Sequence, residues 1–446
     1  MGRFIVRERR TAKRRVVVVT SSAFAILFVV AVAVTLGLRL WLAARQVAHV
    51  RAHRVATPAA FATRIDDAAH RKAADYTIAK QRFGMIEAAA DTAVLLLLTE
   101  GGVLGWLMAA TERLATPPLV RDVLLLCAIA LIAGLVSLPF SWWRTFRIEE
   151  RFGFNRTTLA TWLGDLAKGL AVAAALGLPL AFVVLWLMRS AGTYWWVFVW
   201  IAWMAFQLLV LVLYPTVIAP LFNRFSPLPA GAARERIERL LARCGFRASG
   251  LFVMDGSKRS GHGNAYFTGF GRAKRVVFFD TLLTRLAPEE IEAVLAHELG
   301  HFRLRHVVKR VVWSAVFSLA LLALLAWLAR TPWFYAGLGI PADNVAVAMT
   351  RPGVALALFM LVLPVFTFVL APLAAAYSRR HEFEADAFAA AHASAGALVA
   401  ALIKLYEDNA ATLTPDPVHS AFYDSHPPAA IRVARLSALA PSAAGT

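Results

Sequence analysis

Seven long apolar segments constrain this chain more than any other feature of its sequence. A membrane-spanning helix needs about 20 consecutive, mostly apolar residues. Seven stretches meet that requirement: residues 16–42, 85–109, 119–143, 169–188, 194–214, 311–328 and 354–377. Charged residues make up only 17% of the 446 residues, against about a quarter in soluble domains. The sequence therefore predicts a mainly α-helical, polytopic membrane protein with about seven transmembrane helices.

The spans divide the chain into four regions. Residues 1–214 form an N-terminal membrane region with five spans, 215–310 a polar insertion, 311–377 two further spans, and 378–446 a C-terminal tail. Because two spans separate the insertion from the tail, both emerge on the same side of the membrane. In the insertion we expect a helix over 232–244, short strands over 251–255 and 276–280, and a helix that starts at Pro288. The two polar pieces together predict a small α+β domain.

The net charge of +19 indicates which side of the membrane this domain faces. Arg and Lys are concentrated in loops 49–82 and 144–168, on the side of the polar pieces, and the positive-inside rule places that side in the cytoplasm. We expect a bacterial-type inner membrane. The N-terminal tail disagrees, because it carries seven Arg and Lys between Arg3 and Arg15 on the opposite side. We base the predicted orientation on the loops, which together hold more Arg and Lys than the tail does. No basic stripe with interleaved aromatic residues predicts nucleic-acid binding.

A zinc-binding motif, His297-Glu298-Leu299-Gly300-His301, lies in the insertion. Histidines four residues apart on a helix share one face, and a catalytic zinc ion takes three protein ligands and keeps one position open for water. Glu298 can reach that water without binding the metal. A metzincin would continue with Gly and His where this chain has Leu304 and Val307. On a continued helix His306 would point away from the metal, so the third ligand must come from elsewhere.

The best source of the third ligand is the acidic segment 378–386 at the start of the C-terminal tail. We expect Glu382 to complete a site for one Zn²⁺ ion per chain. Asp386 shares a helix face with Glu382 at the i, i+4 spacing, and we expect it to orient a ligand histidine. Glu384 points elsewhere on such a helix.

Several further stretches resemble the type I CAAX prenyl protease family of integral membrane zinc endopeptidases. They lie in family order from about the second span to the C-terminus: LPFS at 138–141, IEERFGFN at 148–155, YP at 214–215, IAPLFN at 218–223, NAYF at 264–267, FDTL at 279–282 and SHPP at 425–428. One departure is Gly263, where the family usually has Ser before this Asn264.

The resemblance implies a ring of seven helices around a chamber within the membrane, with a zinc site at one end, and processing of proteins with a prenylated C-terminal cysteine. By matching position, His297, His301 and Glu382 are zinc ligands and Glu298 is the catalytic glutamate. Asn264 matches a residue on a strand that lines the cleft, and His426 a histidine near the site.

The expected reaction is hydrolysis of a peptide bond. Glu298 would act as general base, and His426 would donate a hydrogen bond to the oxyanion. The edge strand with Asn264, Ala265 and Tyr266 would pair with an extended substrate.

Three other functions compete with this interpretation. A quality-control metalloprotease that cuts membrane proteins without a prenyl group would carry the same site. A multi-pass transporter is disfavoured because the spans are nearly free of charged residues. A zinc-stabilised scaffold would not need Glu298 beside the water position. The expected partners are thus a peptide or protein substrate, with or without a lipid, and the bilayer.

Overall fold

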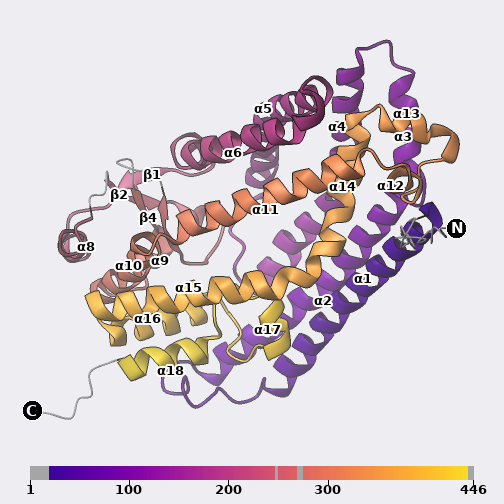
Figure 1. Cartoon of the computed structure of the whole chain (residues 1–446). Helices are drawn as coiled ribbons and strands as arrows, with labels where there is room; N and C mark the ends of the chain where they lie inside the picture. Colours follow the sequence, from indigo (N-terminus) through magenta and orange to yellow (C-terminus); the bar gives the residue numbers. More distant parts are fainter. Residues whose placement is uncertain (1–19, 247–249, 269–274, 440–446) are drawn as a thin grey trace, which may run out of the picture.

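Long helices lead from one end of the molecule to a small mixed domain at the other (Figure 1). The computed structural model describes residues 20–246, 250–268 and 275–439. The helices of the membrane part are α1 (Ser21–Ala52), α2 (Asp67–Leu98), α3 (Val103–Glu112), α4 (Pro118–Trp143), α5 (Leu159–Ser190), α6 (Trp195–Leu213), α11 (His306–Leu328), α12 (Pro332–Ala336), α13 (Val345–Met349) and α14 (Pro352–Thr367). The remaining elements are α7 (Ala219–Phe222), β1 (Phe225–Pro227), α8 (Ala232–Arg243), β2 (Gly250–Met254), β3 (Ala265–Thr268), β4 (Arg275–Phe279), α9 (Asp280–Leu283), α10 (Pro288–Arg303), α15 (Ala371–His392), α16 (Ala395–Asp408), α17 (Pro417–Tyr423) and α18 (Ala429–Leu439).

Six helices in the described part of the chain are long and apolar enough to cross a membrane, and a bent pair brings the number to seven. The bent pair is α2 and α3, whose axes differ by 50°. The expected span over 85–109 is therefore present as a bent pair of helices rather than as one straight helix. The chain breaks at Gly102, whose φ of +73° lies in the left-handed region that glycine adopts without strain.

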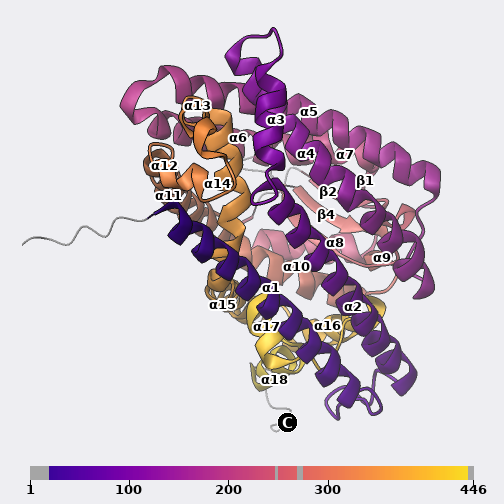
Figure 2. The same ribbon diagram turned by 90° about the vertical axis from the view of Figure 1, so that its right-hand side faces the viewer.

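The membrane helices bury little of their apolar surface inside the protein. In the most apolar windows of α4, α5 and α6, only 6% of the residues are buried, and large side chains such as Leu131, Leu170 and Ile201 are exposed. Such faces are stable in contact with lipid, because the bilayer core is itself apolar. In Figure 2, α1 and α2 run together along one side of the molecule.

The helix that contains the last span continues far beyond residue 377, where the span was expected to end. A helical run from Pro352 to His392 contains α14, one turn of 3₁₀ helix and α15. The boundaries expected at residues 310 and 377 therefore lie inside α11 and α15, and both helices lead from the membrane part directly into the mixed domain. The predicted strands and the helix beginning at Pro288 are present as β2, β4 and α10.

The mixed domain is built on a four-stranded sheet with the order β1-β2-β4-β3. The strand β3 pairs antiparallel with β4 and forms one edge of the sheet. Leu240, Phe278, Leu295 and Leu402, from α8, β4, α10 and α16, are buried in the domain's shared core.

The start of α1 lies at the end of the molecule opposite this domain (Figure 1). There the ring of Phe24 packs edge-on against Trp333, with 4.7 Å between centroids. The seven basic residues of the N-terminal tail lie outside the described residues. The position of α1 places the N-terminal end of the first span opposite the mixed domain.

Candidate metal centre

The helix α10 carries the motif histidines and packs closely against α15. Pro288 occupies its first turn, and the Glu290 carboxylate accepts a hydrogen bond from the Ala287 amide at 2.7 Å. Gly300 lies at the crossing of the two helices, where an added Cβ would come within 3.0 Å of the Ala385 Cα. The glycine inside the motif thus permits the close approach that brings α15 to the histidines.

Three side chains from these two helices converge on one point. The Nε2 atoms of His297 and His301 are 3.2 Å apart. Glu382 places one carboxylate oxygen 3.4 Å from Nε2 of His297 and the other 3.2 Å from Nε2 of His301. His297 and Glu382 are buried, and His301 is mostly so.

This donor set fits a zinc ion. Tetrahedral ligands at about 2.0–2.2 Å from zinc lie about 3.3–3.5 Å from one another, close to the observed separations. The buried Oε2 atom of Glu382 accepts no hydrogen bond within the described part of the chain. An ionised oxygen that is buried without a partner is costly, and a cation at this point would remove the cost.

Asp386 holds the other nitrogen of His297. Its carboxylate lies 2.9 Å from Nδ1 of the ring and also accepts a hydrogen bond of 2.9 Å from Nε of Arg432. Burial alone would lower the pKa of His297, but the adjacent carboxylates of Asp386, at 2.9 Å, and Glu382, at 3.4 Å, raise this pKa to about 9. In the metal-free protein this imidazole is therefore protonated at neutral pH.

Arg432 is a site residue that the sequence interpretation missed. It lies on α18 and is only 5% exposed. It shares the buried face of α18 with Ala429, Val433 and Leu436. An arginine within an apolar stripe at helical spacing was the signal that could have identified it, because a buried arginine requires an acidic partner.

His306 is much closer to the site than a continued helix would place it. The helix α10 ends at Arg303, and Arg305 adopts a left-handed conformation with φ of 57° before α11 begins. The reversal brings Nδ1 of His306 to 2.9 Å from Nδ1 of His301. Nε2 of the fully buried His306 then lies 3.0 Å from the Glu384 carboxylate. The expectation that His306 points away from the site is wrong, whereas Glu384 contacts His306 and is not part of the His297, His301 and Glu382 cluster.

Glu298 and His426 lie around the same cluster. The pKa of Glu298 is raised, chiefly because burial disfavours its charged form. His426 is exposed, and its Nε2 lies 3.5 Å from a Glu382 oxygen. Its Nδ1 lies 3.0 Å from the Ser425 hydroxyl. Although much of the His426 side chain is exposed, the surrounding protein partly desolvates the ring and lowers its pKa, which favours a neutral ring that can donate from Nε2.

The other predicted residues lie at the edge of the sheet. Asn264 is exposed, Ala265 is buried and Tyr266 is half-buried. The Asn264 side chain accepts a hydrogen bond from the Ala265 amide at 2.8 Å. His262, near this edge, makes other contacts: its Nδ1 lies 3.1 Å from the Asn409 side chain, and its ring stacks on Phe154.

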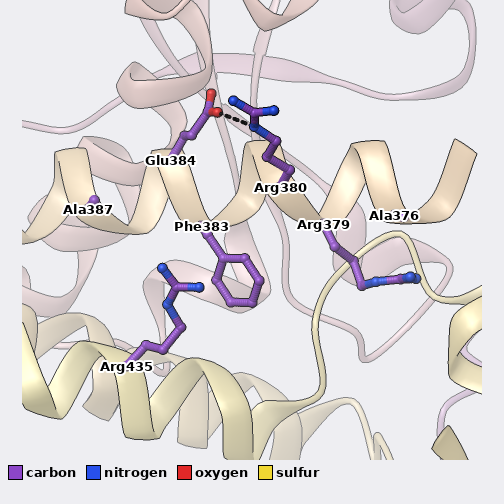
Figure 3. A pocket seen from close by; sticks show the side chains of 7 residues that line it. All are labelled: Ala376, Arg379, Arg380, Phe383, Glu384, Ala387 and Arg435. Carbon is purple, nitrogen blue, oxygen red and sulfur yellow. Dashed lines mark hydrogen bonds and ion pairs between the residues drawn. The ribbon is translucent and has the colours of Figure 1, made fainter. Parts of the chain in front are cut away.

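A hollow of about 480 Å³ lies between α15 and α18, and none of the three ligand side chains lines it. Figure 3 shows Phe383 beside Arg435, while Glu384 projects from the other side of α15 and pairs with Arg380 at 3.0 Å. The hollow is thus separate from the metal cluster. Glu384 is the residue of its lining that also contacts His306.

The sequence of the chain matches known protein families along most of its length. Residues 46–224 match the family described as CAAX prenyl protease N-terminal, five membrane helices, and residues 227–440 match peptidase family M48. The chain is 35% identical over 372 residues to the CAAX prenyl protease 1 homolog of Oryza sativa subsp. japonica, covering 82% of this chain and 85% of that protein. It is 33% identical over 393 residues to CAAX prenyl protease 1 of Saccharomyces cerevisiae, covering 83% and 86%.

A solved structure agrees with these matches. The crystal structure of S. mikatae Ste24p superposes with a TM-score of 0.84 at 28% identity, and the match covers 93% of this chain and 99% of that one. The expected arrangement of membrane helices around a chamber is thereby confirmed. The chain therefore belongs to the CAAX prenyl protease group of peptidase family M48, whose members are membrane metalloproteases.

Proposed function

We propose that this protein is a zinc-dependent endopeptidase that cuts near the C-terminus of prenylated proteins. The observation that carries the proposal is the convergence of His297, His301 and Glu382, with separations of 3.2–3.4 Å and a Glu382 oxygen without a hydrogen bond. Two imidazoles and one carboxylate form a donor set typical of hydrolytic zinc sites, which leave one position for water.

The roles of the neighbouring side chains follow from their positions. A bound zinc ion would supply Lewis acidity and lower the pKa of water at this point. Glu298 follows the first ligand and takes the proton of the attacking water, which it passes to the leaving amine. His426 is exposed beside Glu382 and donates from Nε2 to the oxyanion.

The substrate backbone is expected to bind along β3. This strand is the edge of the sheet and lies beside α10, so its outer backbone groups can pair with an extended peptide. Asn264, Ala265 and Tyr266 would line that path. A prenyl chain attached to the same peptide would extend among the membrane helices.

We also propose that the mixed domain faces the cytoplasm of a bacterial-type inner membrane. Loops 49–82 and 144–168 lie on its side of the spans and are rich in Arg and Lys. A C-terminal reporter that is active only in the cytoplasm would be active in this orientation. A C-terminal reporter that is active only after export would contradict it.

Cleavage of two matched peptides tests the substrate class. Purified protein in detergent is given a C-terminal peptide with a farnesylated cysteine and its unmodified twin, with Glu298→Ala as the inactive control. Faster cleavage of the farnesylated peptide supports the proposal. Equal cleavage would retain the zinc endopeptidase and favour membrane-protein quality control, the alternative that carries the same site. No cleavage of either peptide by zinc-loaded protein would contradict the substrate class.

A further inference from the structure

The two ligand histidines are supported in different ways on the side that faces away from the metal cluster. Nδ1 of His297 meets the Asp386 carboxylate directly. Nδ1 of His301 instead meets a second imidazole, that of His306, at 2.9 Å. On this side the carboxylate, that of Glu384, contacts His306 instead of the ligand histidine, at 3.0 Å from Nε2 of His306.

The contacts from His301 through His306 to Glu384 determine which nitrogen of each imidazole carries the ring proton. Nε2 of His301 faces Glu382 and the metal position, so as a ligand it carries no proton. The ring proton of His301 is then on Nδ1. Two ring nitrogens 2.9 Å apart share one proton, so Nδ1 of His306 accepts it. The proton of His306 is therefore on Nε2, where it is donated to Glu384.

We propose that His306 and Glu384 are positioning residues that fix the tautomer and ring orientation of His301. The inference rests on the proposed role of His301 as a zinc ligand. Hydrogen bonds to the second nitrogen of a ligand histidine raise its basicity and orient its ring, and their loss typically weakens metal binding by about 10- to 100-fold.

The surroundings hold His306 in this orientation. Its ring is fully buried and stacks on His381 at 4.0 Å between centroids, with only 8° between the planes. Glu384 is oriented in turn by Arg380, 3.0 Å away, and lies 3.8 Å from Lys309 (Figure 3). The chain reversal at Arg305 places His306, the first residue of α11, where a straight continuation of α10 would not place it.

His306, His381 and Glu384 could be taken for a second metal site, since their ligand atoms lie within 4.8 Å of one another. The stacking argues against it. A metal ion binds an imidazole in the plane of the ring, and two parallel rings cannot both direct a lone pair at one ion between them. Both nitrogens of His306 also have partners already.

Zinc affinity of the metal-free protein tests the proposal, measured in detergent by competition with a chelator. His306→Ala and Glu384→Ala should each weaken zinc binding by about 10- to 100-fold. His306→Asn places an amide oxygen where the imidazole carries Nδ1, so it should recover most of the affinity lost in His306→Ala. Glu384→Gln keeps an acceptor oxygen and should lie between Glu384→Ala and the wild type.

Matched controls separate this role from a structural one. His392→Ala removes an exposed histidine from the same helix and should bind zinc as the wild type does. The visible absorption of Co²⁺-substituted protein, which reports ligand geometry, should change in His306→Ala and be restored in His306→Asn. The thermal midpoint of metal-free Glu384→Ala should stay near that of the metal-free wild type, because Glu384 is partly exposed.

Three results would overturn the inference. The first is unchanged zinc affinity in Glu384→Ala and His306→Ala. The second is equal loss of affinity in His306→Ala and His306→Asn. The third is a wild type that binds two zinc ions and loses one in Glu384→Ala, which would indicate a second metal site instead. A wild type that binds no zinc would overturn the proposed function itself, so the two failures are distinguishable.

Discussion

Nδ1 of His297 lies 2.9 Å from the carboxylate of Asp386, which is one helical turn beyond Glu382 on α15. One helix thus supplies both the proposed third ligand and the group that orients the first. Since α15 continues from a membrane span, a displacement of that span would move both carboxylates together relative to α10.

We predict that Asp386→Asn weakens zinc binding by about 10- to 100-fold, because His297 loses the charged acceptor that orients it. The substitution also removes the closer of the two carboxylates beside the buried Arg432, which keeps only Glu382 at 3.8 Å, and this should lower the free energy of unfolding by about 3–5 kcal/mol. Chelator competition and thermal unfolding measure the two effects. Arg432→Met is the informative comparison, because it should destabilise the fold while zinc binding changes less. Wild-type zinc affinity in Asp386→Asn would contradict the orienting role.

Glu382→Ala should lose the metal. Without its carboxylate the site keeps two imidazoles, and a zinc site with two protein ligands is not typical of hydrolytic enzymes. Metal analysis after gel filtration should show about one zinc per chain in the wild type and close to none in the variant. Glu238→Ala, which removes an exposed glutamate that pairs with Arg234 on α8, is the control. Full occupancy in Glu382→Ala would remove this residue from the ligand set.

Glu298→Gln should retain zinc but lose turnover. The amide keeps the size of the side chain and cannot accept the water proton, so kcat should fall by about 10²- to 10⁴-fold. Metal content and peptide cleavage should be measured on the same preparation. Substantial remaining activity at full zinc occupancy would show that another group acts as the base.

The membrane part of the fold could be predicted because each span is a local property of the sequence. About 20 apolar residues suffice to identify a span, whatever its neighbours are. The break between α2 and α3 could not be located in this way, since Gly101 and Gly102 lie within an apolar run that hydropathy reads as one segment. The end of the last helix could not be located from hydropathy for a related reason: apolar character stops near Tyr377, but the helix continues to His392.

The convergence of the proposed ligands could be predicted in part because helical spacing relates His297 to His301 and Glu382 to Asp386. His306 could not, because its place depends on Arg305 in a left-handed conformation. That conformation is uncommon for residues other than glycine, and the sequence gives no signal for it. Arg432 is buried through pairing with Asp386, which is distant in the sequence. The residues missed are thus those whose positions depend on tertiary structure rather than on local periodicity.

His426→Ala should lower kcat by about 10²- to 10³-fold, as expected on loss of one oxyanion donor, and leave zinc content unchanged. KM should change little, because the proposed hydrogen bond forms only as the oxyanion develops. His426→Gln can restore a donor near the position of Nε2 and should recover part of the activity, whereas His392→Ala should match the wild type. If KM rises while kcat is unchanged, His426 contributes to substrate binding instead.

Zinc affinity should rise with pH over an unusually wide range. In the metal-free protein the Asp386 and Glu382 carboxylates raise the pKa of His297 to about 9 despite its burial, and zinc requires the neutral ring. Below pH 9 zinc must displace this proton, so affinity should increase about tenfold per pH unit up to that value.

The same proton stabilises the metal-free fold. This contribution is complete below the unfolded pKa of about 6.5 and is lost as the pH rises towards 9. Chelator competition and thermal unfolding between pH 6.5 and 9.5 measure both trends, and zinc affinity that is constant above pH 7 would show that His297 is already neutral there.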